Sequence, residues 1–352
     1  MNNGEEMAHT TEHQYPKQNI NPIKKSILVV GGAGYIGSHI VKTLFKNGYS
    51  PVVVGREIKK LPILSQWADC YELDLPRDIY ALDEIVKRHN IDTCINTAAH
   101  TAVGESVKDP VKYYHNNLVM CIQLLNKLKD LDVKNFIFSS SAATYGIPEK
   151  GICYDTEKNL HPINPYGKTK LMIEKILQDY WTAYHVRSIS LRFFNVGGAD
   201  LDNEIGESHE VETHIIPLAI QAGFNADEFY LFGDNYNTPD GTCLRDYVHV
   251  VDVAEAHLQA VRLISEKITC DSFNIGSGKG TSNMQILNEV QRHTGAMDIV
   301  KSPKRAGDPD QLIADISRTK EQLNWKPIHS SIDKIVQTAV QWYKHNHRKD
   351  IN

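Results

Sequence analysis

A loop of seven residues, Gly31-Gly32-Ala33-Gly34-Tyr35-Ile36-Gly37, constrains the fold more than any other feature of this chain. It directly follows the short apolar run 26–30 and opens a segment whose apolar residues recur with helical spacing until Gly48. Glycines at these positions permit a tight turn and let the backbone approach a pyrophosphate at the positive N-terminus of a helix. The loop therefore predicts a dinucleotide site contacted by Gly31, Gly34, Tyr35, Ile36 and Gly37.

Apolar runs and amphipathic segments alternate through the first half of the chain. This alternation is typical of parallel strands with helices on both faces, and it predicts an α/β protein with a Rossmann-type, doubly wound parallel sheet. The predicted strands are residues 26–30, 51–54, 92–97, 135–140 and 188–194, and the predicted helices, besides the one that ends at Gly48, are 77–88, 110–131 and 165–184.

The alternation stops after about Val196, where loops rich in Gly, Asn and Asp mix with shorter elements. We expect residues 24–196 to form the dinucleotide-binding domain, and residues 197–345 to form mainly a smaller α/β lobe for the substrate. The chain is expected to cross back to the first domain, so a single boundary is a simplification. Residues 1–23 are polar and have no signal-peptide pattern, which predicts a disordered extension. The shorter elements are predicted at residues 214–222, 229–232, 252–265, 282–293 and 318–323.

Composition argues against several classes of protein. The net charge of -5 gives no reason to expect a nucleic-acid partner, and an anionic substrate would need local Arg or Lys side chains. No apolar run reaches the roughly 18 residues of a membrane span. The six cysteines include no Cys-x-x-Cys pair, and the 16 histidines show no obvious ligand spacing. We therefore expect a cytoplasmic protein with free thiols and no bound metal.

The second predicted strand ends differently from most dinucleotide-binding sequences. An acidic residue normally follows the glycine loop by about 20 positions and binds the adenosine ribose. Here the strand ends Val54-Gly55-Arg56. Arg56 would suit the 2′-phosphate of NADP, or it is simply solvated while NAD binds through other contacts. Asp74 and Leu75, after a further strand to which the pattern gives no bounds, are placed to meet the adenine.

Tyr166 and Lys170 are four residues apart at the start of a predicted helix, so they share one face. A free tyrosine has a pKa near 10, and a nearby ammonium and a cationic nicotinamide ring would lower that pKa. Such a tyrosine can remove a proton from a hydroxyl group while hydride leaves the same carbon. Ser141, at a strand end, is expected to bond the reacting oxygen, and Ser139 is expected to bond backbone or cofactor.

Together these residues resemble the sugar-nucleotide branch of the extended short-chain dehydrogenases, the NAD-dependent epimerase/dehydratase family. Within it the likeness is greatest to the UDP-glucose 4-epimerases, and it runs from about Ser26 to Tyr343. The resemblance implies catalysis by Ser141, Tyr166 and Lys170, and it favours NAD, since such enzymes mostly use it. Stretches that carry the likeness beyond the generic motifs are residues 102–106, 113–117, 135–146, 164–168, 192–195, 233–242 and 245–249.

The resemblance also implies a reaction and a set of ligand contacts. Tyr166 would take the proton of the C4 hydroxyl of a UDP-hexose, hydride would pass to the nicotinamide, and the 4-keto sugar would turn before hydride returns. Arginine suits a diphosphate, because its bonds to phosphate are bidentate and directional. A homodimer packed through the helices at 110–131 and 165–184 is implied as well. The implied cofactor contacts are Ala98, Asn116, Ser139, Tyr166, Lys170 and Phe194, and those to the UDP part are Asn195, Arg245, Arg305 and Asp308.

Three positions depart from the pattern of these epimerases. The stretch 98–101 lacks the lysine that usually follows an Ala-Gly pair, so a cofactor contact is in doubt. His214 stands where an asparagine near the substrate is usual. Leu312 stands where a tyrosine limits the sugar pocket in strict glucose/galactose enzymes. An aliphatic side chain there would relax discrimination against N-acetylated sugars, an effect worth about 1–3 kcal/mol.

Alternative functions remain at this point. A UDP-N-acetylglucosamine 4-epimerase, or an enzyme of dual specificity, is the main one. A UDP-uronate epimerase or decarboxylase would need a carboxylate partner in the sugar pocket, which the sequence does not place. A 4,6-dehydratase would need an Asp-Glu pair where Ala142-Ala143 stands. A catalytically inactive cofactor sensor would not be expected to keep both Tyr166 and Lys170.

Overall fold

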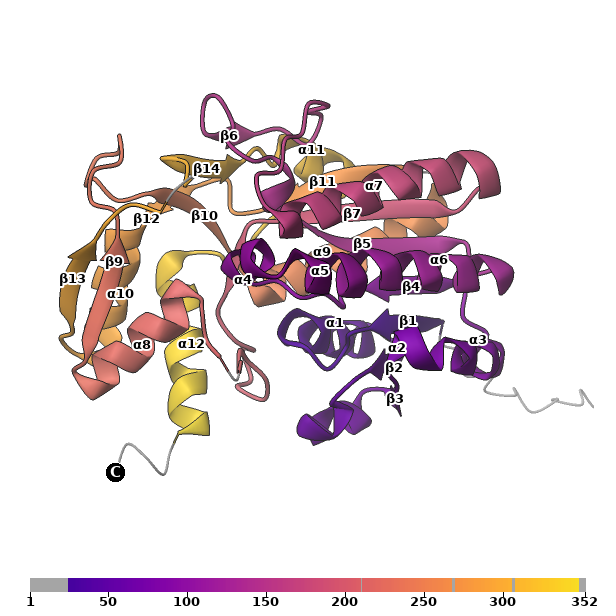
Figure 1. The fold of residues 1–352 in the computed structure, drawn as a ribbon. Helices are drawn as coiled ribbons and strands as arrows, with labels where there is room; N and C mark the ends of the chain where they lie inside the picture. The colour runs from indigo at the N-terminus through magenta and orange to yellow at the C-terminus, as the bar shows by residue number, and fades with distance from the viewer. Residues whose placement is uncertain (1–24, 210, 268–269, 306–307, 348–352) are drawn as a thin grey trace, which may run out of the picture.

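The computed structural model describes residues 25–209, 211–267, 270–305 and 308–347 (Figure 1). The larger part is a seven-stranded sheet of order β11-β7-β5-β4-β1-β2-β3, in which every neighbouring pair is parallel. The predicted Rossmann-type sheet is thus confirmed, whereas the predicted extension 1–23 lies outside the described residues. The strands are β1 (Ser26–Val30), β2 (Ser50–Gly55), β3 (Asp69–Glu72), β4 (Thr93–Asn96), β5 (Asn135–Ser141), β7 (Arg187–Phe193) and β11 (Cys270–Ile275).

Two hydrophobic cores lie on the two faces of this sheet. In β1, Ile27 and Val29 belong to one core and Leu28 and Val30 to the other, and all four are at most 1% exposed. Burial on both faces explains why the strand reads as a continuous apolar run. Helices α1 (Tyr35–Lys46) and α9 (Val250–Glu266) cover the first face, and α2 (Leu75–Asp78), α3 (Leu82–His89), α6 (Met120–Asp130) and α7 (Pro165–Tyr184) cover the second.

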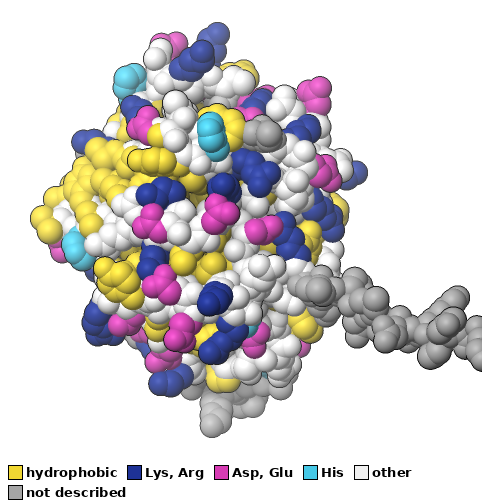
Figure 2. All heavy atoms as spheres, turned by 90° about the vertical axis from the view of Figure 1, so that its right-hand side faces the viewer, with side chains coloured by type: hydrophobic (Ala, Val, Ile, Leu, Met, Phe, Trp, Pro, Cys, Tyr) yellow, Lys and Arg dark blue, Asp and Glu magenta, His cyan; other side chains and the backbone are white. Residues whose placement is uncertain are grey.

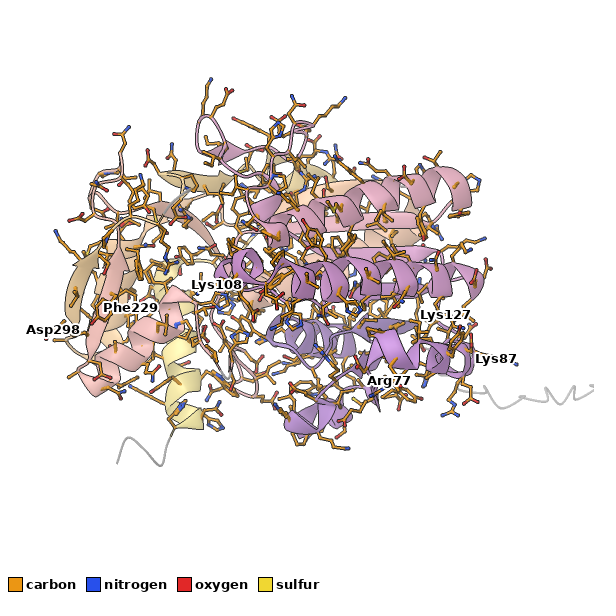
Figure 3. The ribbon with its side chains drawn as sticks, in the orientation of Figure 1. Arg77, Lys87, Lys108, Lys127, Phe229 and Asp298 are labelled. Atoms are coloured by element: carbon orange, nitrogen blue, oxygen red, sulfur yellow. The ribbon has the colours of Figure 1, made fainter. Side chains whose placement is uncertain are left out.

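Two of the predicted helices are interrupted. The helix predicted at 110–131 consists of α5 (Pro110–Tyr113), a π-helical segment (Tyr114–Val119) and α6. The π-helical segment lies where buried Asn117 bonds both the backbone N–H and the carbonyl of His100, at 2.8 and 3.0 Å. Likewise, a 3-10 turn separates α2 from α3 within the helix predicted at 77–88. The ion pair between Lys127, labelled in Figure 3, and Asp83 connects α6 to α3.

A smaller lobe lies beside the carboxyl ends of the central strands, on the left of Figure 1. Its own core joins the three helices α8 (Ile215–Asn225), α10 (Asn283–Thr294) and α12 (Ile332–Asn346) to a two-stranded sheet of β9 and β13. Phe229, labelled in Figure 3, belongs to this sheet. Between β10 (Leu244–His249) and β12 (Gly280–Ser282) the chain returns to the main sheet. There α9 packs on α1, and β11 pairs with β7. None of the described helices is long and apolar enough to cross a bilayer.

The remaining elements of the chain complete this lobe and its junction with the sheet. Apart from α8, α10, α11 and β9, the sequence pattern did not predict them. They are α4 (Val103–Lys108), β6 (Ile152–Cys153), β8 (Asn195–Gly197), α8 (Ile215–Asn225), β9 (Glu228–Phe232), β10 (Leu244–His249), β12 (Gly280–Ser282), α10 (Asn283–Thr294), β13 (Asp298–Ser302), β14 (Gln311–Ala314), α11 (Ser317–Gln322) and α12 (Ile332–Asn346).

A buried ion pair fixes α7 on the sheet. Arg192 at the end of β7 donates to Glu174 on α7, with Nη2 to Oε2 at 2.6 Å and Nε to Oε1 at 3.0 Å. The two side chains are only 5% and 6% exposed. Ser140 donates to the same carboxylate at 2.5 Å, and Tyr145 accepts from Arg192 Nη1 at 3.0 Å. The helix is therefore held by paired charges whose separate burial would be costly.

We expect Arg192→Met to lower the free energy of unfolding by about 3–5 kcal/mol, because it leaves the Glu174 carboxylate buried without its partner. The double variant Arg192→Met/Glu174→Gln should recover a large part of that loss. Arg292→Met is the matched control, since Arg292 pairs with Glu289 while 72% exposed and should change stability by less than about 1 kcal/mol. Urea unfolding measures all three, and equal effects for the buried and exposed arginines would contradict this account.

Candidate active site

The glycine loop connects β1 to α1 in the way a pyrophosphate site requires. The N–H of Gly31 bonds the carbonyl of Val54 at 2.8 Å, which holds the loop against β2. A Cβ on Gly37 would lie 2.2 Å from the carbonyl oxygen of Gly31, so only glycine fits there. At Gly34, the residue before α1, a Cβ would meet only that same oxygen, at 3.4 Å. Gly34 therefore leaves the N-terminus of α1 open on this side, and a helix N-terminus of this kind is suited to a pyrophosphate.

Tyr35 and Ile36 have other uses for their side chains. The hydroxyl of Tyr35 donates to the carbonyl of Gly198 at 2.5 Å and so joins the loop to the residue after β8. Burial raises the pKa of Tyr35 well above its usual value, and the nearby carboxylates of Glu207 and Glu212 raise it further. Ile36 packs against the core on the α1 face of the sheet. A cofactor contact by these two residues would therefore come mainly from their backbone.

The candidate adenine contacts lie at the ends of β2 and β3. Arg56 is exposed just after β2, and its charge helps to lower the pKa of His100, after burial and Lys112. Asp74 is half-buried and its backbone N–H donates to Asp78, whereas Leu75 is a core residue only 5% exposed. These positions leave Arg56 and Asp74 as the polar side chains of this group.

Ala98 and Asn116 lie beside the glycine loop and the π-helical segment. The backbone N–H of Ala98 bonds Asn96 Oδ1 at 3.1 Å, and a Cβ on Gly31 would clash with this N–H. Asn116 donates to the Lys112 carbonyl at 2.8 Å and is half-buried. Its neighbour Asn117 is the buried residue that bonds the His100 backbone, so the π-helical segment gives the two adjacent asparagines different positions.

The first turn of α7 places Tyr166 beside the end of β5. Asn164 caps the helix by accepting from the N–H of Gly167 at 2.8 Å, and Pro165 occupies the first turn. A Cβ on Gly167 would lie 2.4 Å from the carbonyl oxygen of Ala143, so glycine allows the helix to approach the turn that follows Ser141. The sequence Asn-Pro-Tyr-Gly-Lys is thus explained by cap, turn and close packing.

The protein environment sets the protonation of the three candidate catalytic groups. Burial raises the pKa of Tyr166, while a hydrogen bond with Ser141 lowers it and so favours the phenolate. Ser141 Oγ also accepts from the Ala143 N–H at 3.1 Å, which leaves its own proton free to be donated. Among the protein groups described, burial therefore outweighs the lowering by Ser141, and the effect of a cationic nicotinamide ring on the Tyr166 pKa stays a prediction.

Lys170 lies behind Tyr166, almost entirely buried. Its ammonium donates to the carbonyl of Ser139 at 2.7 Å and lies 5.7 Å from the centre of the Tyr166 ring. Burial lowers the pKa of Lys170 to about 8, although Cys121 and Glu174 oppose this shift. The ammonium is thus held at the end of β5, and its charge is only weakly compensated by its surroundings.

Ser139 and Phe194 are buried residues at the ends of neighbouring strands. The hydroxyl of Ser139 is bonded to His257 Nε2 at 3.1 Å, so that side chain is engaged inside the protein. Phe194 packs against Tyr145, with ring centres 6.4 Å apart, in a small core that also contains Ala142. Both side chains are therefore enclosed by other parts of the protein at these strand ends.

The candidate UDP contacts meet on a second sheet, of five strands, which has the order β12-β10-β14-β6 with β8 paired to β10. Arg245 on β10 donates to Asp308 at 3.0 Å, and Asp308 also accepts from the Tyr236 hydroxyl at 3.3 Å. Arg245 stands opposite Leu312 in the β10–β14 register, and Leu312 packs against the small core that contains Phe194 and Ala142. The structure thus brings an arginine, a carboxylate and the predicted specificity residue close to the Ser141 turn.

Asn195 and Arg305 extend this group in two directions. Asn195 on β8 stands opposite Tyr247 on β10 and hydrogen-bonds its side chain, while burial raises the pKa of Tyr247 to about 12. The guanidinium of Arg305 lies 4.3 Å from the ring centre of Phe232 on β9. The carbonyl of Arg305 accepts from the N–H of Asp308, which links these two candidates.

His214 has a different environment from the other candidate substrate residues. Its Nδ1 lies 2.6 Å from Glu207 Oε1 and 3.2 Å from Glu212 Oε1. Burial alone would lower its pKa, but these two carboxylates raise it to about 10. The imidazole Nδ1 is therefore bound to the loop before α8, and only the other ring nitrogen is free of these contacts.

Several residues that shape the site were absent from the sequence-based prediction. Tyr236 and Tyr247 lie within stretches that were noted only for their likeness to a family, 233–242 and 245–249. Glu207, His209 and Glu212 carried a usable signal, since carboxylates and imidazoles alternate with His214 at intervals of two and three residues. Contacts such as Ser139 with His257 join distant parts of the chain and left no pattern in it.

A dinucleotide-type loop beside a serine, a tyrosine and a lysine is typical of the short-chain dehydrogenase class. The chain matches the NAD dependent epimerase/dehydratase family over residues 27–276 and belongs to it. It is 43% identical to a UDP-glucose 4-epimerase of Lactobacillus helveticus, over 90% of this chain and 97% of the relative.

Solved structures of similar proteins agree with this assignment. A UDP-glucose 4-epimerase from Brucella ovis in complex with NAD is 42% identical, with a TM-score of 0.84 over 90% of this chain and 98% of the other. The enzyme of that name from Bifidobacterium longum, in complex with NAD+ and UDP, is 32% identical, with a TM-score of 0.85 over 92% and 99%.

The buried ammonium of Lys170 should give the protein a measurable pH dependence of stability. Its pKa is about 8 in the fold against 10.5 normally, so the unfolded chain binds the proton more tightly. The ammonium therefore destabilises the fold below pH 8, and this penalty disappears as the pH rises from 8 to 10.5. Lys170→Met should raise the free energy of unfolding at pH 7, by up to about 3 kcal/mol.

Urea unfolding between pH 7 and 10.5 measures this effect. The difference in stability between the wild type and Lys170→Met should shrink as the pH rises. Lys175→Met, an exposed position on the same helix, is the control and should show no such trend. A pH-independent difference for Lys170→Met would contradict the lowered pKa.

Proposed function

We propose that this chain is a UDP-glucose 4-epimerase, an isomerase that interconverts UDP-galactose and UDP-glucose with bound NAD. The observation that carries the proposal is that Ser141, Tyr166 and Lys170 come together where the carboxyl end of β5 meets the first turns of α7. The glycine loop lies at the same edge of the sheet, because β1, β4 and β5 are parallel. The family assignment and the epimerase relatives, one of them bound to NAD+ and UDP, support the same substrate class.

The residues of the chain supply the proton chemistry of this reaction. Tyr166 accepts the proton of the C4 hydroxyl as its phenolate, and Ser141 donates a hydrogen bond that stabilises the phenolate. Lys170 adds a positive charge nearby and is held in place by the Ser139 carbonyl. NAD, when bound, supplies a hydride acceptor and donor, so no net oxidation is needed. Tyr166 returns the proton to the C4 oxygen as hydride is restored to C4, which completes the cycle with no net change in oxidation state.

The second sheet holds the nucleotide while the sugar changes its orientation. Arg245 and Arg305 are suited to the diphosphate, because guanidinium–phosphate bonds are strong and directional. Asp308 is suited to the ribose hydroxyls, and its present bond to Arg245 keeps that guanidinium aligned. Asn195 would contact the same ligand from β8. An anchor on UDP leaves the hexose free to present either face to the nicotinamide.

We assign NAD rather than NADP as the cofactor. Arg56 is exposed and lies beyond the end of β2, which is compatible with a solvated side chain. The related structures from Brucella ovis and Bifidobacterium longum contain NAD. We further propose the cytoplasm as the compartment, because all six cysteines are free and four of them are buried.

The first test is to incubate the purified protein with NAD and UDP-galactose and to follow UDP-glucose by NMR. Conversion to an equilibrium mixture is expected. Tyr166→Phe should lower kcat by about 100-fold or more while leaving the circular dichroism spectrum unchanged, because only the proton acceptor is lost. An absence of turnover by the wild type, with NAD confirmed as bound, would exclude the proposed reaction.

A second candidate function is epimerisation of UDP-N-acetylhexosamines, which the half-buried aliphatic side chain of Leu312 favours. The same assay with UDP-N-acetylgalactosamine decides it. If the wild type converts this substrate, Leu312→Tyr should lower kcat/KM for it by about 10–100-fold and should affect UDP-galactose much less. Leu312→Met keeps a flexible, non-aromatic apolar side chain of similar volume there and serves as the control.

We also propose a homodimer formed through α5, α6 and α7. Figure 2 shows apolar side chains gathered at its left edge, which corresponds to the front of Figure 1, where these helices lie. An exposed apolar patch of this kind commonly marks a protein interface. The exposed apolar residues of these helices and of the preceding α4 and π-helical segments are Val103, Val107, Val111, Val119, Met172 and Tyr184, which are 40–75% exposed.

Light scattering at micromolar concentration should give the mass of two chains. Val111→Asp combined with Val119→Asp should produce monomers, because each copy would bury two charges in the interface. Ile328→Asp is the control, since Ile328 is 71% exposed but lies near none of these helices in sequence and should remain dimeric. A monomeric wild type would overturn this assignment.

A further inference from the structure

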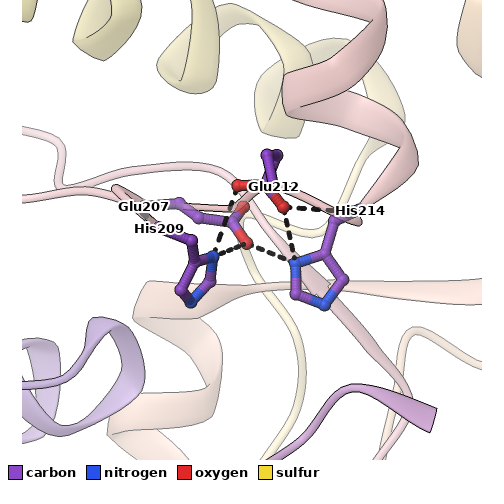
Figure 4. A group of neighbouring side chains, drawn as sticks. All are labelled: Glu207, His209, Glu212 and His214. Carbon is purple, nitrogen blue, oxygen red and sulfur yellow. Dashed lines mark hydrogen bonds and ion pairs between the residues drawn. The ribbon is translucent and has the colours of Figure 1, made fainter. Parts of the chain in front are cut away.

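Four side chains of the loop between β8 and α8 converge on one point (Figure 4). Glu207 Oε1 lies 3.3 Å from His209 Nδ1 and 2.6 Å from His214 Nδ1. Glu212 meets the same two nitrogen atoms, with Oε2 at 3.3 Å and Oε1 at 3.2 Å. One ligand atom from each of the four residues can be chosen so that all lie within 4.8 Å of one another.

The carboxylates in this cluster are the buried partners. The side chains of Glu207 and Glu212 are 9% and 15% exposed, whereas those of His209 and His214 are 40% and 50% exposed. Among the described residues, every ion pair of these two carboxylates is made with one of the two imidazoles. Two nearly buried negative charges therefore face each other, and their contacts raise the pKa of His209 to about 9 and that of His214 to about 10. A divalent ion bound here would take the place of the two imidazolium protons that now neutralise the carboxylates.

We propose that Glu207, His209, Glu212 and His214 form a binding site for one Zn²⁺ ion. Zinc takes four N or O ligands in a tetrahedron at about 2.0–2.1 Å, so neighbouring ligand atoms are separated by about 3.3 Å. Glu212 would ligate through Oε2, because its Oε1 already accepts from the N–H groups of Thr213 and His214. His209 Nδ1 lies 3.3 Å from this Oε2 and 3.3 Å from Glu207 Oε1, and the 2.6 Å contact between His214 Nδ1 and Glu207 Oε1 has to lengthen. Two imidazoles and two carboxylates also form a neutral complex with a divalent ion.

The other two groups of potential ligands among the described residues are poorer candidates. Asp200, Asp202 and Glu204 surround the ammonium of Lys42, which lies 2.5–2.9 Å from each of them and occupies the place that an ion would need, although an ammonium cannot itself be a ligand. A second group has a single imidazole, His293, which is 3.3 Å from Glu289 and 3.8 Å from Asp333. The cluster at 207–214 alone combines two imidazoles with two carboxylates.

The position of the site indicates what a bound ion would do. The carbonyl of Glu207 accepts from the indole N–H of Trp342 on α12 at 2.9 Å, and His214 immediately precedes α8. With four protein ligands the ion has no open position for substrate, as in structural zinc sites. It would therefore fix the connection between the main sheet and the smaller lobe. This inference does not depend on the proposed function.

Zinc binding is tested on the untagged full-length protein after treatment with a chelator. Isothermal titration with Zn²⁺ alone should show one ion per chain, and metal analysis after gel filtration should give the same ratio. Co²⁺ in place of zinc should give the intense visible absorption of a tetrahedral complex, which reports the geometry without any mutation. No zinc retained by the wild type, or a weak octahedral Co²⁺ spectrum, would overturn the proposal.

Variants then locate the ion. His209→Ala and Glu212→Gln should each weaken zinc binding at least about tenfold, because each removes a ligand. His293→Ala is the matched control and should bind zinc like the wild type. Loss of zinc in His293→Ala with retention in the other two variants would place the ion elsewhere and refute the assignment. Circular dichroism of each metal-free variant separates a lost ligand from a lost fold.

Discussion

The close approach of α7 to the turn after β5 is the contact on which the site depends. A helix can meet this turn only where it has no side chain, and Gly167 provides that place opposite Ala143. The approach brings Tyr166 to Ser141 and carries Lys170 to the Ser139 carbonyl. The Arg192–Glu174 pair then prevents the helix from sliding, since any shift would separate two buried charges. The position of α7 and the pairing of its buried charge with Arg192 therefore depend on each other.

The same junction explains why the candidate catalytic groups are individually unfavourable for the fold. A phenol and an ammonium are both buried where water cannot solvate their charges, and burial shifts the two pKa values in opposite directions. Strained or poorly solvated groups commonly accumulate at functional sites, and the surrounding sheet stabilises them. The second sheet adds Arg245 and Asp308 from another part of the chain, so the site is completed only where the two parts meet.

Much of the nucleotide-binding part could be predicted from sequence, because strands buried on both faces and helices with one apolar face leave strong patterns. The helix at Pro165–Tyr184 was predicted with its observed bounds. The smaller lobe gave weaker signals because its strands are short. Its helix α12 was not predicted at all. Sequence also names neighbours without revealing burial, which is why the rise in the Tyr166 pKa caused by burial was not predicted. The contact between His214 and Glu207 was missed because no ligand spacing was recognised among residues 207–214.

The strand order of the main sheet has a consequence for how the chain is made. β7 pairs with β5 on one side and acquires its second neighbour only when β11 is available, and α1 gains its packing against α9 only when that helix has been made. Both elements come after the first segments of the smaller lobe. A growing polypeptide therefore cannot complete its larger half until about residue 275 has left the ribosome, and until then an open strand edge is exposed to other chains. The order of synthesis thus makes the two halves mature together, although each has a core of its own.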